Sequence, residues 1–139
     1  MNSVRPCLPS IPAFTLVTLL AFLAGCGSGS SVVSFTPPSN AAEDALTAAL
    51  EAWKSGEAPG ELIETDQMRI QFADAAREAG AKLTDYEIVQ ALPGDSPRKF
   101  SVKLTLEGAT APEEITYVVV GKDPLVVMRD EEYNRTSAM

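Results

Sequence analysis

The chain has no histidine and very little cysteine, and both absences restrict the chemistry open to it. Its 139 residues include no His and two Cys. Histidine titrates nearest neutral pH among the side chains and is the commonest metal ligand in proteins. A Ser-His-Asp triad is therefore excluded, and no Gly-x-Ser-x-Gly motif occurs. We predict no enzyme, no cofactor and no metal site.

Positive charge is also scarce. Eleven Lys and Arg face nineteen Asp and Glu, so the formal net charge is −8. An acidic chain is repelled by nucleic acid and by anionic lipid headgroups. Nucleic acid is therefore excluded as a partner, and attachment to a membrane would need an anchor other than basic residues.

The apolar runs of the chain are also short, and the longest of them lies near the N-terminus. Residues 11–25 carry no charge but fall short of the roughly 20 residues that cross a bilayer as a helix. Arg5 precedes this run, and the small residues Ala24 and Gly25 end it. A charged start, a short apolar core and a small-residue exit predict a signal peptide over residues 1–25.

Leu23-Ala24-Gly25-Cys26 resembles the lipobox of bacterial lipoproteins. In that family the cysteine receives a diacylglycerol, the leader is removed and the new amine is acylated, so the resemblance implies a lipid anchor at Cys26. Cys7 would leave with the leader, which makes a disulfide within the mature chain impossible. Two alternatives stay open: an ordinary secretory leader followed by a chance cysteine, and an uncleaved anchor.

Residues 26–40 combine the candidate lipidated cysteine with a tether rich in Gly, Ser and Pro. Gly27 stands where that family uses aspartate to retain lipoproteins in the inner membrane, so the resemblance favours the outer membrane. The segment containing Val32, Val33 and Phe35 could instead pair as an edge strand.

A helix is predicted after the tether. Asn40 and Glu43 have the spacing of a capping box. An apolar stripe follows at helical spacing, and Ser55-Gly56 and Pro59-Gly60 end it. The stripe consists of Ala42, Ala45, Leu46, Ala49, Leu50 and Trp53.

Strands are predicted from there to the C-terminus. A short strand over Met68–Phe72 precedes one or two helical turns ending at Gly80. From Lys82 onward apolar and polar residues alternate, most clearly at Phe100, Val102, Leu104 and Leu106. The strands expected there are 83–89, 100–107, 115–120 and 125–129, followed by a polar tail at 133–139 that we expect to fray.

These elements predict one α+β domain over residues 41–132, in which the amphipathic helix packs on a curved antiparallel sheet of about four strands. The runs AWKSGEAPGELIE, GAKLTDYEIV and ITYVVVGKDPLVVMRDEEY resemble a group of uncharacterised bacterial envelope proteins. They also look like the cystatin/NTF2-like architecture, in which a curved sheet wraps one helix. The resemblance implies no catalytic residues.

The remaining candidates for a site are charged or aromatic side chains. Glu113-Glu114 and Asp130-Glu131-Glu132 are interpreted as solvated charges at strand ends, and Arg129 as either an anion ligand or a surface residue. Trp53, Tyr86 and Tyr117 are interpreted as packing residues.

Two functions remain open. One is an envelope lipoprotein whose non-catalytic domain binds or scaffolds an envelope protein. The other is a small-ligand-binding or enzymatic NTF2-like domain.

Overall fold

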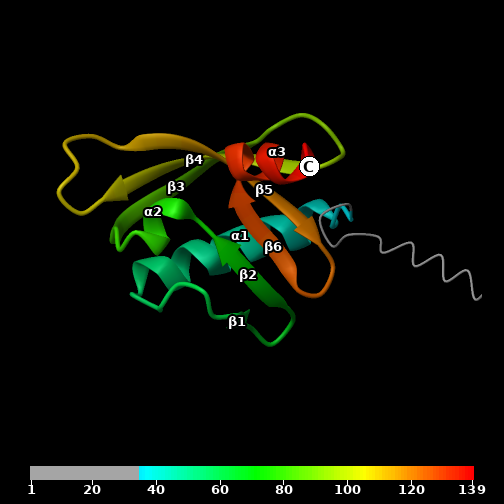
Figure 1. Cartoon of the computed structure of the whole chain (residues 1–139), viewed down its shortest axis with the longest axis horizontal. Coiled ribbons are helices and arrows are strands. Elements are labelled where there is room, and N and C mark those ends of the chain that lie inside the picture. Colours follow the sequence, from blue (N-terminus) through cyan, green and yellow to red (C-terminus); the bar gives the residue numbers. More distant parts are fainter. Residues whose placement is uncertain (1–34) are drawn as a thin grey trace, which may run out of the picture.

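The computed structural model describes residues 35–139, so the signal peptide, the lipobox with Cys26 and the first part of the tether lie outside the described residues. The described chain has three helices and six strands and belongs to the α+β class, as predicted (Figure 1). None of its helices is long and apolar enough to cross a membrane. The elements are α1 (Ser39–Lys54), β1 (Ile63–Glu64), β2 (Arg69–Ala73), α2 (Ala75–Glu78), β3 (Leu83–Ala91), β4 (Arg98–Leu106), β5 (Glu113–Gly121), β6 (Leu125–Arg129) and α3 (Asp130–Ser137).

Helix α1 forms where its apolar stripe predicts it. All six residues of the stripe are buried, and the helix ends at Lys54, with Gly56 at φ +84° directly after its C-cap. Glycine adopts this left-handed conformation without the clash that a Cβ would cause. The predicted capping box is wrong: the N-cap is Pro38, and no side chain caps the helix.

The sheet is larger than predicted and is mixed. It has six strands in the order β1-β2-β6-β5-β4-β3, and β2 pairs with β6 in parallel. The expected strands β3 to β6 form an antiparallel meander, but β2 returns beside the last of them. A parallel pair needs a long crossover, which α2 and β3 to β5 supply here. Strand β1 is two residues long and too short to leave a clear pattern in the sequence.

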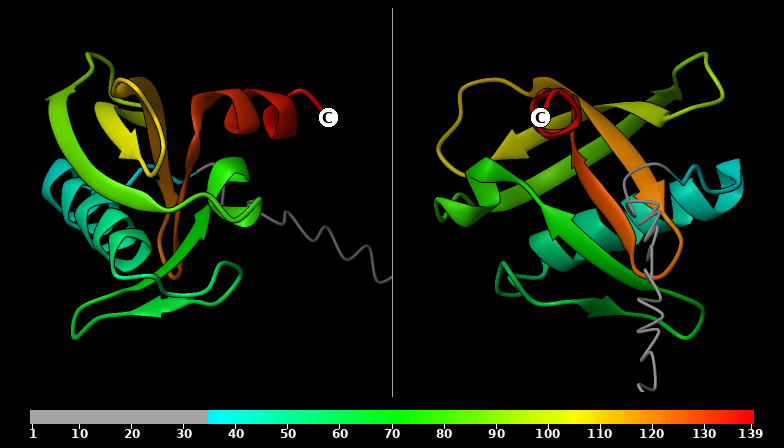
Figure 2. Two further views of the ribbon diagram at one scale, coloured as in Figure 1. Left: turned by 90° about the vertical axis from the view of Figure 1, so that its left-hand side faces the viewer. Right: turned by 45° about the vertical axis from the view of Figure 1, so that its right-hand side comes forward.

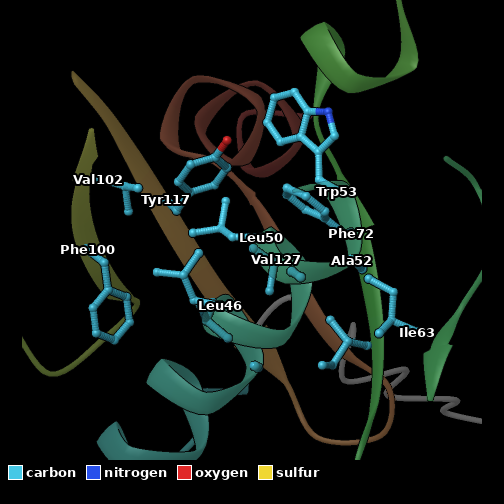
Figure 3. Packing of buried hydrophobic residues seen from close by; sticks show 14 of the residues in the cluster. Leu46, Leu50, Ala52, Trp53, Ile63, Phe72, Phe100, Val102, Tyr117 and Val127 are labelled. Atoms are coloured by element: carbon cyan, nitrogen blue, oxygen red, sulfur yellow. The ribbon is translucent and has the colours of Figure 1, made fainter. Parts of the chain in front are cut away.

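The sheet is curled (Figure 2). Strands β5 and β6 bury apolar side chains on both of its faces. Val119 and Val127 belong to the main core under α1. Figure 3 shows Val127 there with Leu46, Leu50 and Phe72. The opposite face is buried by a smaller cluster with α3 beside it, containing Val118, Val120, Val126 and Met128 together with Ala73 and Tyr133. This second cluster explains why both strands are apolar throughout.

The two ends of the described chain are more ordered than the sequence predicts. Residues 133–139 were expected to fray, but Asp130–Ser137 form α3, whose first turn carries the acidic residues that a helix N-terminus favours. At the other end, the Phe35 carbonyl accepts a 2.6 Å hydrogen bond from the Gly121 amide, and the Pro37 carbonyl accepts one from Arg98. The last residues of the predicted tether therefore pack on the domain.

Candidate functional site

A pocket of about 510 Å³ opens at the C-terminal end of α1. Its walls come from the end of α1, the α1–β1 loop, the α2–β3 connection and the beginning of β3. We call it the Arg77 pocket, and its main residues are Trp53, Glu57, Ala58, Arg77, Ala81 and Lys82. Its volume falls within the range of sites for small molecules.

Arg77 is buried although it lies on the short helix α2, with only 3% of its surface exposed. Its Nη2 donates to the carbonyls of Glu57 and Ala58, at 3.0 and 3.1 Å, and these bonds hold the α1–β1 loop against α2. Nε and Nη1 are buried without a hydrogen-bond partner among the described residues. Burial lowers the pKa of Arg77, against the opposing effect of Glu57 and Asp74. A buried donor without a partner costs about 1–3 kcal/mol, so these atoms are unusual in a folded protein.

The aromatic residues beside Arg77 fix its position. The guanidinium lies 5.2 Å from the centre of the Phe72 ring, a cation–π contact. Phe72 meets Trp53 edge to face, with the ring centres 6.0 Å apart. The Trp53 indole nitrogen donates to the Ala81 carbonyl at 2.8 Å, which ties α1 to the α2–β3 connection. Trp53 is therefore a packing residue, as predicted, and its position also makes it part of the pocket wall.

The rim of the Arg77 pocket carries charges of both signs. Three cationic residues, Lys54, Arg77 and Lys82, face two acidic ones, Glu57 and Glu107. Lys82 lies 3.9 Å from Glu107, and both side chains are largely exposed. Lys54 lies 3.4 Å from Asp85 of β3, so of the three cationic residues Arg77 alone lacks an ion pair within residues 35–139.

A second buried polar group lies where β2 passes into α2. Asp74 is fully buried, and its carboxylate accepts five hydrogen bonds. Two come from the backbone amides of Ala76 and Arg77 and cap α2. The others come from the Tyr117 hydroxyl at 2.5 Å and from Nε and Nη2 of Arg129 at 2.8 and 3.3 Å. We call Asp74, Tyr117 and Arg129 the Asp74 cluster.

The Asp74 cluster stabilises the fold and leaves little capacity for ligand binding. Burial and the neighbouring carboxylate raise the pKa of the Tyr117 hydroxyl, so this group stays protonated. The pKa of Arg129 is also raised: burial opposes its charge, but the hydrogen bonds and negative charge of Asp74 outweigh burial. Since a carboxylate offers about four lone pairs, that of Asp74 is saturated. The sequence offered Arg129 as a possible ligand of an anion, but its guanidinium is already paired with the Asp74 carboxylate.

The acidic runs Glu113-Glu114 and Asp130-Glu131-Glu132 do not bring their carboxylates together at one site. Glu114 accepts a hydrogen bond from Ser101 at 2.6 Å, and Asp130 pairs with Lys99 at 2.7 Å. Glu132 accepts from the Ala75 amide, and burial raises its pKa. Between residues 35 and 139, no group of three or more acidic or thiol side chains is arranged to hold a metal ion.

Tyr86 and Tyr117 differ in their surroundings. Tyr117 lies fully buried in the main core, which agrees with its predicted packing role. Tyr86 is half-buried on β3 and donates a 2.5 Å hydrogen bond to Glu51 of α1. Burial, together with this bond, raises the pKa of Tyr86 to about 12.

Asp74 and Arg77 were not singled out from the sequence. An aspartate directly before Ala75-Ala76-Arg77-Glu78 is a typical N-cap signal, and it could have located the beginning of α2. Nothing local indicates that Asp74 meets Arg129, 55 residues away, or that Arg77 is buried.

Comparisons of the chain with protein-family models, with curated proteins and with solved structures find no match. The geometry of the Arg77 pocket and the sequence of the N-terminal segment are therefore the grounds for assigning a function.

Proposed function

We propose that the protein is a lipid-anchored component of the bacterial cell envelope whose α+β domain binds a ligand in the Arg77 pocket without catalysing a reaction. The observation that carries the binding role is the pocket itself, whose wall includes Arg77, a buried guanidinium with N–H groups that have no acceptor in the described part of the chain. The anchor rests on Leu23-Ala24-Gly25-Cys26, and the glycine after Cys26 supports an outer-membrane location.

The position of the pocket suits a protein held by its N-terminus. Phe35 and Pro37 contact the domain near the beginning of α1, at the β5–β6 turn and at Arg98. The 16 residues of α1 then extend for about 24 Å to the pocket. In Figure 1 the cyan beginning of α1 lies far from α2, which is close to the other end of α1. The lipid would therefore hold the opposite end of the domain near the membrane, and the pocket would face away from it.

A cystatin/NTF2-like relationship is part of the same proposal. One helix in the curl of an antiparallel meander supports it. In this chain, Leu46, Leu50 and Phe100 occupy the space between α1 and the sheet (Figure 3). A ligand would therefore bind at the end of α1 rather than beneath it.

A non-catalytic role is favoured by the surroundings of the charged groups. Acid–base or nucleophilic catalysis by a carboxylate needs a group with a shifted pKa that can reach a substrate. Asp74 is buried and saturated with donors, and Glu132 is held by a backbone amide. The two acidic residues at the pocket, Glu57 and Glu107, are exposed on its rim.

Two measurements test the proposal. Mass spectrometry of the mature N-terminus should find an acylated Cys26, and Cys26→Ser should abolish lipid incorporation. An unmodified N-terminus at another residue would instead support the alternative of a cleaved, secreted protein without lipid.

The binding role is tested with the full chain purified in a non-ionic detergent. A panel of neutral and charged small molecules should include compounds that change the fluorescence of Trp53, the single tryptophan of the chain. Ester, phosphate and glycoside substrates should show no turnover with or without divalent metal. Reproducible turnover that is lost on changing one carboxylate would favour the enzymatic alternative.

A further inference from the structure

Arg77 has more N–H groups than its surroundings accept. A guanidinium has five N–H donors, and Nη2 uses its two on the carbonyls of Glu57 and Ala58. The three donors on Nε and Nη1 have no acceptor among residues 35–139. Buried polar groups in native structures are nearly always paired, with protein, water or a ligand.

The acidic residues close to Arg77 do not meet this need. The nearest buried carboxylate, that of Asp74, is saturated by Tyr117, Arg129 and the backbone of α2. Glu57 and Glu78 are exposed, and Glu57 contacts Arg77 through its backbone carbonyl. Among the described residues the guanidinium therefore has no direct ion pair, whereas Lys54 and Lys82 at the pocket have Asp85 and Glu107 as partners.

We propose that the Arg77 pocket binds the carboxylate group of a small ligand with an apolar body, with Arg77 as the main partner and Lys82 at the rim. Guanidinium and carboxylate are planar and form two parallel hydrogen bonds, which are shorter and stronger than neutral ones. The apolar part of the ligand would lie on the wall formed by Trp53, Ala81 and Leu83. This inference rests on the proposed binding function and names its ligand class.

The charge of the pocket favours a carboxylate over a phosphate. Lys54 and Lys82 are paired with Asp85 and Glu107, so the guanidinium of Arg77 supplies one positive charge that has no ion-pair partner among the described residues. A carboxylate carries one negative charge, whereas a phosphate monoester carries nearly two at neutral pH. The second negative charge of a phosphate would be repelled by Glu57 and Glu107 at the rim and by the net charge of −8 of the chain.

Access to the guanidinium requires a movement of the α1–β1 loop. The side chains of residues 55–62 are exposed, and the loop contains two glycines in the left-handed conformation, Gly56 and Gly60. The hydrogen bonds from Arg77 Nη2 to the carbonyls of Glu57 and Ala58 attach this loop to α2. A ligand carboxylate would reach Nε and Nη1 as the loop moves outward.

The experiment uses matched pairs of acid and amide on the full chain in a non-ionic detergent. Hexanoate is compared with hexanamide, N-acetylleucine with its amide, and inorganic phosphate serves as the third arm. The readouts are Trp53 fluorescence and the NMR shifts of the backbone amides of residues 55–60. We expect each acid to bind about tenfold or more tightly than its amide, because only the acid can form the charge-assisted pair. The two acids distinguish a fatty-acid ligand from the C-terminus of a peptide.

Variants locate the binding. Arg77→Lys should abolish the preference for acid over amide, and Lys82→Ala should weaken it. Arg69→Lys makes the same change at an exposed arginine outside the pocket and should leave the preference intact. Because Arg77→Lys could unfold the domain, the comparison of acid and amide on the unchanged protein stands as an independent test.

Three results would overturn the inference. Equal binding of acid and amide would remove the carboxylate specificity and leave the binding function standing. Tighter binding of phosphate than of either acid would replace the ligand class. No response to these probes or to the wider panel of small molecules would contradict the binding function itself.

Discussion

Replacing Asp74 by asparagine tests whether the Asp74 cluster stabilises the fold. The substitution keeps the shape of the side chain and removes its charge, so the Arg129 guanidinium, whose side chain is 12% exposed, loses its counter-ion. Removing one partner of a buried ion pair costs about 3–5 kcal/mol, because the other charge stays buried. Since domains of this size are stable by roughly 5–15 kcal/mol, Asp74→Asn should remove a large share of the free energy of unfolding.

The assay is urea unfolding at neutral pH, followed by circular dichroism and Trp53 fluorescence. The matched control is Asp123→Asn, which breaks an ion pair to Arg69 of similar length, 2.9 Å, whose side chains are 49% and 60% exposed. An exposed pair contributes about 0–1 kcal/mol, so the control should unfold near the concentration of the unchanged protein.

A double mutant separates the ion pair from other effects of the substitution. Arg129→Met alone leaves the buried Asp74 carboxylate without its ion-pair partner. Combined with Asp74→Asn, it removes both charges, so the loss of stability should be smaller than the sum of the single losses. A loss below about 1 kcal/mol for Asp74→Asn, or additive losses in the double mutant, would refute the reasoning.

The remaining predictions concern the core, the helix end, one titration and the anchor. Leu104 is buried, so Leu104→Ala should lower the free energy of unfolding in urea by about 2–5 kcal/mol. Lys103 is exposed, so Lys103→Ala should change it by less than about 0.5 kcal/mol. Equal losses would mean that the register of β4 is wrong. Gly56→Ala should cost about 1–2 kcal/mol through backbone conformation alone, since its Cβ would meet no atom within 4 Å. The pKa of Tyr86 is about 12 in the folded protein, above its value in the unfolded chain. The protonated Tyr86 hydroxyl therefore contributes fully to stability below about pH 10, and this contribution is lost as the pH rises toward 12. Tyr86→Phe should remove a phenolate absorbance step near pH 12, and a step near pH 10 instead would contradict the Glu51 contact. Cys26→Ser should release the protein from the membrane fraction, and unchanged retention there would contradict the lipid anchor.

The local elements could be predicted because each depends on residues close together in the chain. The stripe of α1 and the Ser55-Gly56 stop are periodic or positional signals that the structure confirms. The alternation in β4 is confirmed at Phe100, Val102, Lys103 and Leu104, but Ser101, expected on the solvated face, is buried and donates to Glu114. The α+β class follows, since one amphipathic helix and several half-buried strands must cover each other's apolar surfaces.

Other features depended on contacts between distant residues. The parallel pairing of β2 with β6 joins segments more than 50 residues apart, and it places Asp74 beside Arg129. Helix α3 is polar, and its fit beside the second apolar cluster became visible only in three dimensions. Sequence patterns record which residues prefer to be buried, but not which partners they meet.

The same distinction holds for the site. The sequence by itself determined which chemistry was closed: with no histidine and no cysteine after Cys26, a site built on imidazole or thiol groups is excluded there, while carboxylates, arginine, lysine and aromatic residues are present. Arg77 is one of eleven cationic residues, and no local pattern distinguishes it. Only the tertiary structure decided that its guanidinium is buried over the Phe72 ring, with donors that have no acceptor among residues 35–139, because the packing of α1, β2, α2 and the α1–β1 loop brings these groups together.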